Sequence, residues 1–155
     1  MEKITIIYGP ARSGKSRLAT DIARNKNTSW ITGRKRKFFD DPFIFYDVDE
    51  TTELIIIDDI PGKYFRDTME FLMPDEIIVN KRSKAPFKIP RPKIIITLQD
   101  EQFQFAKGAS IDARFDFIKL ESIEDYFKER EKLFGRLGKS LIETAISHIK
   151  QATQP

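Results

Sequence analysis

The segment from Gly9 to Ser16 constrains the fold of this chain more than any other part, because it reads Gly-Pro-Ala-Arg-Ser-Gly-Lys-Ser. It matches the pattern G-x-x-x-x-G-K-[ST] at every fixed position and directly follows a strand-like run, Ile4 to Tyr8. The glycines let the backbone curl so that successive N–H groups face a polyphosphate, and the helix that follows presents the positive end of its dipole. The pattern therefore predicts a phosphate-binding loop between a strand and a helix.

The positions of this loop have distinct expected roles. Lys15 is placed to reach the β- and γ-phosphates of ATP, and the Ser16 hydroxyl is placed to ligate Mg²⁺. The alternative is a chance glycine-rich turn, and the strand before the loop and the helical pattern after it argue against that. The expected nucleotide-binding residues are Gly9, Pro10, Ala11, Arg12, Ser13, Gly14, Lys15, Ser16 and Arg17.

A pair of acids follows an uninterrupted run of apolar residues, Leu54 to Ile57. Such a run is typical of a strand buried on both faces of a parallel sheet, and open α/β sheets bind ligands at the carboxyl ends of their strands. We therefore expect Asp58 and Asp59 to lie beside the phosphate loop if this strand and the strand before the loop are neighbours. Asp58 suits a metal-binding role, and Asp59 suits the base that activates water for hydrolysis. The alternative for Asp59 is that it caps a turn before Ile60.

Charge is segregated along the chain. Residues 40–59 carry eight acids and no basic residue, and within them the run Phe43 to Tyr46 is compatible with an edge strand. After a hairpin-like run, Ile77 to Val79, residues 81–93 carry six basic residues and no acid, interleaved with three prolines. This mixture predicts an exposed, stiffened loop and not a core element. For the basic run Arg34 to Lys37, a solvated loop and a nucleic-acid or partner contact are equally open.

The remaining periodicity predicts one α/β domain, because 155 residues suffice for one core and not for two. We expect residues 1–121 to form the core and residues 122–155 a helical extension packed on the same domain. Helices are expected at Arg17 to Lys26, Tyr64 to Met73, Ile123 to Phe134 and near Ser140 to Gln151, and further strands at Ser29 to Thr32, Lys93 to Thr97 and Phe115 to Leu120.

Composition narrows the class of protein. The chain has no cysteine, which excludes disulfides and thiolate metal sites. No apolar run approaches about 18 residues, and the first strand-like run starts almost at once. We therefore expect neither a signal peptide nor a membrane-spanning segment, and a cytoplasmic location. The single histidine, His148, has no catalytic partner nearby in the sequence and is expected to be a surface or packing residue.

The order and spacing of these motifs resemble the superfamily 3 helicases, which are AAA+-related motors of viral and plasmid replication initiators. The resemblance spans Ile4 to Leu120 and is strongest to the helicase domains of initiators from small circular single-stranded DNA genomes. It implies ATP hydrolysis at interfaces between identical subunits. It also implies that Gln99 replaces a water-positioning asparagine, that Arg114 reaches the ATP of a neighbouring subunit, and that a basic hairpin grips single-stranded nucleic acid. The hairpin residues implied are Lys81, Arg82, Lys84 and Lys88.

The resemblance also implies a fold and the need for partners. The fold is a three-layer P-loop NTPase fold with a central, mostly parallel sheet, in which the phosphate-loop strand lies between the strands at Lys93 to Thr97 and Phe117 to Leu120. The strand at Leu54 to Ile57 lies further out. With one histidine, the chain lacks the paired-histidine metal site of a nicking domain, so a separate nicking or origin-binding protein is expected.

Two other functions remain open on the sequence. The first is a small-molecule or nucleotide kinase, in which residues 81–93 form a lid that grips phosphate. The second is a nucleotide-binding assembly module with little turnover, which the replacement at Gln99 favours. Release of phosphate from ATP without an acceptor separates the hydrolase from the kinase, and a change of oligomeric state with ATP identifies the assembly module.

Overall fold

A five-stranded parallel sheet forms the centre of the protein, in a computed structural model that describes residues 3–32, 41–99 and 114–135. The strand order is β2-β3-β6-β1-β7, and all four neighbouring pairs run parallel. The phosphate-loop strand thus lies between β6 and β7 with β3 further out, as expected. The strands are β1 (Ile4–Gly9), β2 (Thr28–Thr32), β3 (Leu54–Asp58), β6 (Lys93–Gln99) and β7 (Phe115–Lys119).

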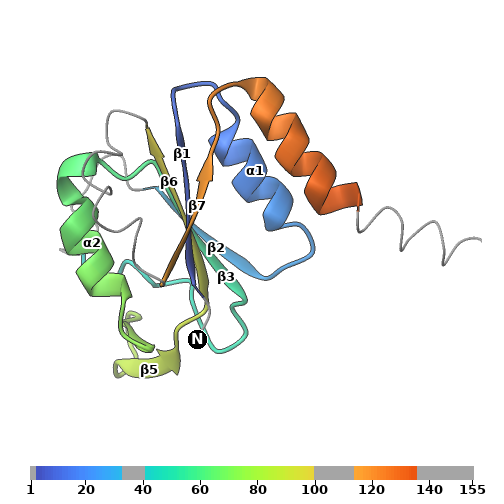
Figure 1. Ribbon diagram of the computed structural model, residues 1–155. Helices are drawn as coiled ribbons and strands as arrows, with labels where there is room; N and C mark the ends of the chain where they lie inside the picture. The colour runs from blue at the N-terminus through green and yellow to red at the C-terminus, as the bar shows by residue number, and fades with distance from the viewer. Residues whose placement is uncertain (1–2, 33–40, 100–113, 136–155) are drawn as a thin grey trace, which may run out of the picture.

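Helices cover both faces of the sheet (Figure 1). On one face lie α1 (Lys15–Ile22) and a helix over residues 123–135. On the other face lies α2 (Phe65–Leu72), which the short 3₁₀ turn η2 (Gly62–Tyr64) introduces. The three-layer α/β fold expected from the sequence is therefore confirmed. None of the helices in the described ranges combines the length and the apolar character needed to cross a membrane.

The two faces of the sheet carry two separate hydrophobic clusters, and the strand sequences explain both. Ile55 and Ile57 face the cluster that includes Met69 of α2, while Ile56 between them faces the cluster that includes Leu18 of α1. All three isoleucines of β3 are fully buried. Because successive residues of a strand point to opposite faces, only a continuous run of apolar residues can fill both layers.

Residues 87–90 correct the expectation of an exposed loop after Val79. They form β5 (Phe87–Pro90), which pairs antiparallel with β4 (Glu76–Val79), and this hairpin lies below α2 in Figure 1. Alternation decides the outcome, because Ile89 is buried opposite Ile77 while Lys88 points outward. The prolines are tolerated because they lie at the end of an exposed edge, where no ladder donor is required.

Residues 43–46 are not an edge strand, and that expectation is wrong. They form consecutive turns in which the N–H of Tyr46 donates to the carbonyl oxygen of Phe43 at 3.0 Å. Asp41 starts the turns, since its carboxylate accepts from the N–H of Phe43 at 2.9 Å. Phe45 is buried and stacks on Phe71 of α2 with ring centres 5.9 Å apart. Aromatic composition suggested a strand, but local hydrogen bonds and this contact with α2 override it.

The other elements agree with the sequence to within a few residues at their ends. The first helix is shorter than expected and stops at Ile22, and Asn25 beyond it has φ of 64°, a left-handed conformation that ends helices. The expected loop at Gln102 to Ser110, the final helix at Ser140 to Gln151, the basic run at Arg34 to Lys37 and His148 lie outside the described residues.

Candidate functional site

Glycine is required at both ends of the phosphate loop. Gly9 has φ of 153°, and a Cβ atom there would lie 1.8 Å from the carbonyl oxygen of Leu120. Gly14 has φ of 94°, and a Cβ atom there would lie 2.7 Å from the Cβ of Tyr126. Both positions are therefore closed to larger residues, by conformation and by contact. The sequence did not predict the contact between Gly14 and Tyr126, because Tyr126 lies far along the chain, in the helix over residues 123–135.

Lys15 lies inside the curl of the loop. Its ammonium group donates to the carbonyl oxygens of Gly9 at 2.9 Å and Pro10 at 2.7 Å. The helix α1 begins at Lys15. The N–H groups in the first turn of a helix have no acceptor within that helix, and here the residues that carry them include the end of the phosphate loop. The hydroxyl of Ser13 is buried and has no hydrogen-bond partner within the described ranges.

The carboxylate of Asp58 joins the loop to the neighbouring strands. Its Oδ1 atom accepts from the hydroxyl of Ser16 at 2.8 Å and from the hydroxyl of Thr97 at 2.7 Å. Ser16 is at the start of α1, Asp58 ends β3, and Thr97 is in β6, which lies between β3 and β1. Parallel strands place all three at the carboxyl edge of the sheet.

A hydrogen bond to Thr97 fixes the backbone of Asp59. It has φ of 61°, an unusual value for a residue with a side chain, and its N–H donates to the Thr97 hydroxyl at 2.8 Å. The next N–H, of Ile60, donates to the Thr97 carbonyl oxygen at 3.3 Å. Non-glycine residues in this conformation cost about 1–3 kcal/mol and persist where surrounding contacts impose them. Thr97 therefore fixes the course of the chain after Asp58.

Thr97 is the residue of this network whose part the sequence did not reveal. In the sequence it appeared only as the last residue of the strand expected at Lys93 to Thr97. The available signal was its position, because Thr97 is the one hydroxyl residue in the run from Ile94 to Leu98. Its contacts depend on β6 pairing with β3, which periodicity does not give.

The other two expected catalytic residues, Gln99 and Arg114, lie at opposite ends of β1. In β6, Gln99 pairs in register with Gly9, so its backbone lies beside the start of the loop. Arg114 precedes β7, and its carbonyl oxygen accepts from the N–H of Ile4 at the opposite end of β1. Five residue steps of about 3.3 Å separate Ile4 from Gly9, which is roughly 16 Å. Arg114 is therefore not part of the loop of its own chain.

A cavity of about 350 Å³ opens at the loop, and one of its walls comes from outside the motif. Ile123, at the start of the helix over residues 123–135, lines it together with Arg12, Lys15 and Arg17. Ser16 also lines it. Ile123 was not expected at this site, since nothing local in its sequence points to the loop.

The helix over residues 123–135 is fixed to α1 by polar contacts as well as by packing. The Tyr126 hydroxyl donates to the Asp21 carboxylate at 2.6 Å, and the Arg130 guanidinium lies 3.8 Å from the same carboxylate. The guanidinium of Arg17 lies over the Tyr126 ring at 5.8 Å. The hydrogen bond to Asp21, and then burial, raise the pKa of Tyr126.

The basic residues expected to bind nucleic acid cluster at the β4-β5 hairpin. Lys81, Arg82 and Lys84 belong to its turn, and Lys88 points outward from β5. Within the described ranges none of these four forms an ion pair closer than 4.0 Å. The side chain of Asn80 donates to the carbonyl oxygen of Pro42 at 2.8 Å and holds the hairpin turn against residues 41–47.

Comparison with known proteins identifies related folds. The chain matches no family model and no curated protein. Two solved structures of the C-terminal region of NrS-1, both apo A forms, are similar to it, with TM-scores of 0.54 and 0.50 at 14% and 12% sequence identity. Each match covers 83% of this chain and 33% of the other, so the chain spans a third of the length of these neighbours. At such identities the similarity is one of fold.

Proposed function

We propose that this chain is a Mg²⁺-dependent ATP-binding and ATP-hydrolysing protein of the helicase type, acting on single-stranded nucleic acid. The observation that carries the proposal is the 2.8 Å contact between the Ser16 hydroxyl and the Asp58 carboxylate. These residues are 42 positions apart, and each was expected on its own to bind the metal of a nucleotide site. Their meeting at the phosphate loop supports a single metal site formed by both residues.

The residues present fit ATP and Mg²⁺. Mg²⁺ prefers oxygen ligands and in nucleotide sites takes one or two protein groups together with phosphate oxygens, which suits Ser16 and Asp58. The Lys15 ammonium donates to two backbone carbonyl oxygens, and phosphate oxygens would replace them as acceptors. Ser13 carries a buried hydroxyl that has no hydrogen-bond partner among the described residues, as expected of a loop built around an anion. Bound Mg²⁺ and ATP would supply the electrophilic phosphoryl group and offset its charge.

The chain's own residues then position the attacking water. Asp59 would accept a proton from that water. It comes directly after Asp58, the proposed metal ligand, and a hydrogen bond to the Thr97 hydroxyl fixes its backbone. Gln99 would orient the water, as its strand runs beside Gly9. We propose that Arg114 acts on a second copy, since it lies at the far end of β1 from its own loop. The ATP site would then lie between subunits of a homo-oligomer.

The hairpin provides the nucleic-acid part of the proposal. Lys81, Arg82, Lys84 and Lys88 are not paired with acids within the described ranges, so their charges remain available to phosphates. Binding dominated by such contacts weakens steeply as salt concentration rises. The kinase alternative needs the same residues as a lid over the phosphate loop. Lys81 and Arg82 instead line a different pocket, beside Trp30 and Tyr46.

The proposal is tested by phosphate release from ATP, measured with and without Mg²⁺ and a single-stranded oligonucleotide at low salt. Lys15→Ala should abolish nucleotide binding, whereas Asp59→Asn should retain binding and slow turnover by about 100-fold or more. Lys26→Ala, in an exposed turn away from the loop, is the matched control and should behave as wild type. Full turnover by both site variants would refute the site. ATP binding without turnover would leave the assembly module as the better description.

Oligomeric state is measured on the same samples by mass. Turnover per chain should rise with protein concentration if a neighbouring Arg114 completes the site, and Arg114→Ala should remove that rise. Turnover per chain that stays constant at every concentration, with a monomeric mass, would exclude an arginine acting between subunits.

A further inference from the structure

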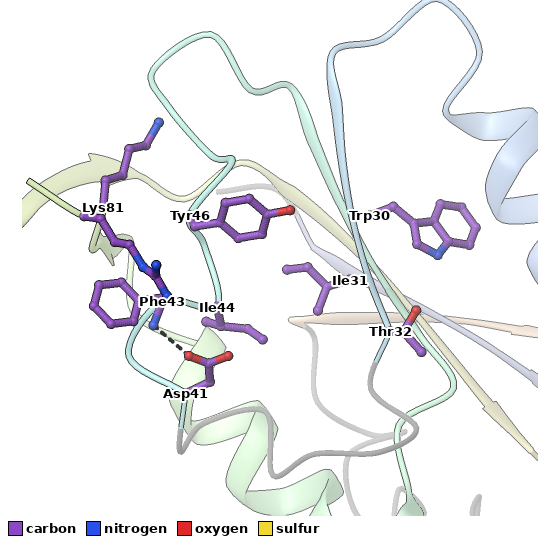
Figure 2. Close-up of a pocket in the computed structure, with 9 residues that line it drawn as sticks. Trp30, Ile31, Thr32, Asp41, Phe43, Ile44, Tyr46 and Lys81 are labelled. Atoms are coloured by element: carbon purple, nitrogen blue, oxygen red, sulfur yellow. Dashed lines mark hydrogen bonds between the residues drawn. The ribbon is translucent and has the colours of Figure 1, made fainter.

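A second pocket, of about 820 Å³, lies along the β2 edge of the sheet, and among the described residues it shares none of its lining with the cavity at the phosphate loop. Three segments distant in sequence form it: the edge strand β2, the turns over residues 41–47 and the hairpin turn after β4. Figure 2 shows the Tyr46 ring pointing toward β2, where Ile31 faces it, and the Trp30 ring beyond the strand. Lys81 lies at the other rim.

Three exposed aromatic residues help to line this pocket. Trp30 is 41% exposed, Phe43 42% and Tyr46 68%. Within the described ranges none of these three rings stacks on another ring, unlike the neighbouring pair Phe45 and Phe71. Aromatic residues gathered at an exposed hollow mark a binding surface, because a folded monomer gains nothing from leaving them in water.

The rim of the pocket favours a negatively charged occupant. Lys81 and Arg82 both line it, and neither is paired with an acid within 4.0 Å in the described part of the chain. Asp41 also lines the pocket, and one of its oxygens accepts from the N–H of Phe43 and so serves the turn. Asp49 is close enough for the Lys81 charge to contribute to lowering its pKa, after the hydrogen bonds from Thr51.

We propose that this pocket binds an unpaired base of single-stranded nucleic acid, with the adjoining phosphates on Lys81 and Arg82. Phe43 and Tyr46 offer the faces on which a base stacks, and Ile31 and Ile44 form the apolar floor. The bond between Asn80 and Pro42 holds the basic turn and the aromatic turn together, so one ligand reaches both. Flat π-faces combined with positive charge are the means by which proteins hold single strands without sequence preference. The inference rests on the nucleic-acid part of the proposed function.

Trp30 makes the pocket directly observable, because it is the only tryptophan of the chain. The experiment titrates the full chain, without nucleotide and at low salt, with a thymidine oligomer of about ten nucleotides and with an abasic oligomer of equal length. The thymidine oligomer should quench Trp30 fluorescence and bind at least about tenfold more tightly than the abasic one. The abasic oligomer should bind through its phosphates alone and leave the fluorescence nearly unchanged.

Variants locate the contact. Tyr46→Ala and Phe43→Ala should each weaken binding of the thymidine oligomer by about 5- to 150-fold, which corresponds to the loss of one stacked base, and leave binding of the abasic oligomer unchanged. Phe127→Ala is the matched control, since Phe127 is 51% exposed but lies in the helix over residues 123–135. It should bind both oligomers as wild type does.

The outcomes separate this inference from the proposed function. Equal binding of the two oligomers would overturn the base pocket and leave the hairpin as a phosphate-binding element. Absence of binding to either would overturn both. If Trp30 fluorescence followed protein concentration alone, with a matching increase in mass, a second copy of the chain would cover the pocket and the inference would be wrong.

Discussion

Thr97 and Thr68 are buried threonines whose hydroxyls have opposite surroundings, and replacing each with valine tests the hydrogen-bond network of the site. Thr97 is 1% exposed and Thr68 0% exposed. The Thr97 hydroxyl accepts from the N–H of Asp59 and donates to the carboxylate of Asp58. The Thr68 hydroxyl has no partner in the part of the chain that the structure describes. Valine keeps the shape of threonine and removes only the hydrogen bonds.

The expected magnitudes follow from what each hydroxyl does. Thr97→Val removes a bond to a charged carboxylate, worth about 1.5–3 kcal/mol, and one from a backbone N–H, worth about 0.5–1.5 kcal/mol. We expect the free energy of unfolding to fall by about 2–4 kcal/mol. Thr68→Val removes a buried polar group that bonds to nothing, so we expect no loss and a gain of up to about 1 kcal/mol.

Urea denaturation followed by circular dichroism measures both variants against wild type. The slope of the unfolding free energy against urea should be the same in all three proteins, so that the midpoints alone report the change in stability. Equal effects of the two substitutions would refute the reasoning. So would a Thr97→Val variant within about 0.5 kcal/mol of wild type, which is the usual range for an inconsequential surface substitution.

Two further substitutions test contacts of the loop and of the helix over residues 123–135. Gly9→Ala would place a methyl group 1.8 Å from the Leu120 carbonyl oxygen, so thermal melting should show an unfolded or severely destabilised protein, and a wild-type melting temperature would show that the loop can shift. Tyr126 has a raised pKa in the folded state because Asp21 accepts its hydrogen bond, so the folded protein holds this proton longer than the unfolded chain. The free energy of unfolding should therefore decline as pH rises above about 10, Tyr126→Phe should lose part of that decline, and an identical pH dependence in urea denaturation would contradict the assignment.

The elements that the sequence predicted correctly are those whose signal is local. A continuous apolar run such as Leu54 to Ile57 is fully buried only in a sheet that is covered on both faces. The loop at Gly9 to Ser16 requires a strand before it and a helix after it. The two errors arose where composition and contact disagree. The aromatic residues at 43–46 suggested a strand, but they form turns that a hydrogen bond to the Asp41 carboxylate stabilises. The prolines near residues 87–90 obscured the alternation that buries Ile89.

The sequence predicted that Asp58 lies beside the phosphate loop, but not which residues reach the loop from the helix over residues 123–135. Ser16 and Asp58 each carried a motif, but Ile123 and Tyr126 reach the loop from a helix whose sequence shows only that it is a helix. Their contribution depends on which way the chain turns after β7. That turn is fixed by contacts between side chains far apart in sequence, such as the bond from Tyr126 to Asp21, which no local pattern reports.

The strand order explains why Thr97 is central to the network. Because β6 lies between β1 and β3, a side chain at its carboxyl end must adjoin both the phosphate loop and the acids. Thr97 reaches Asp58 and the Asp59 backbone because β6 pairs directly with β3, and the pairing of β6 with β1 brings the same edge of the sheet beside the loop. This order of strands was expected from resemblance alone, since periodicity does not give it. The large loss of stability expected for Thr97→Val, set against none for Thr68→Val, therefore tests the contact between the ends of β6 and β3 together with the hydrogen bonds made there.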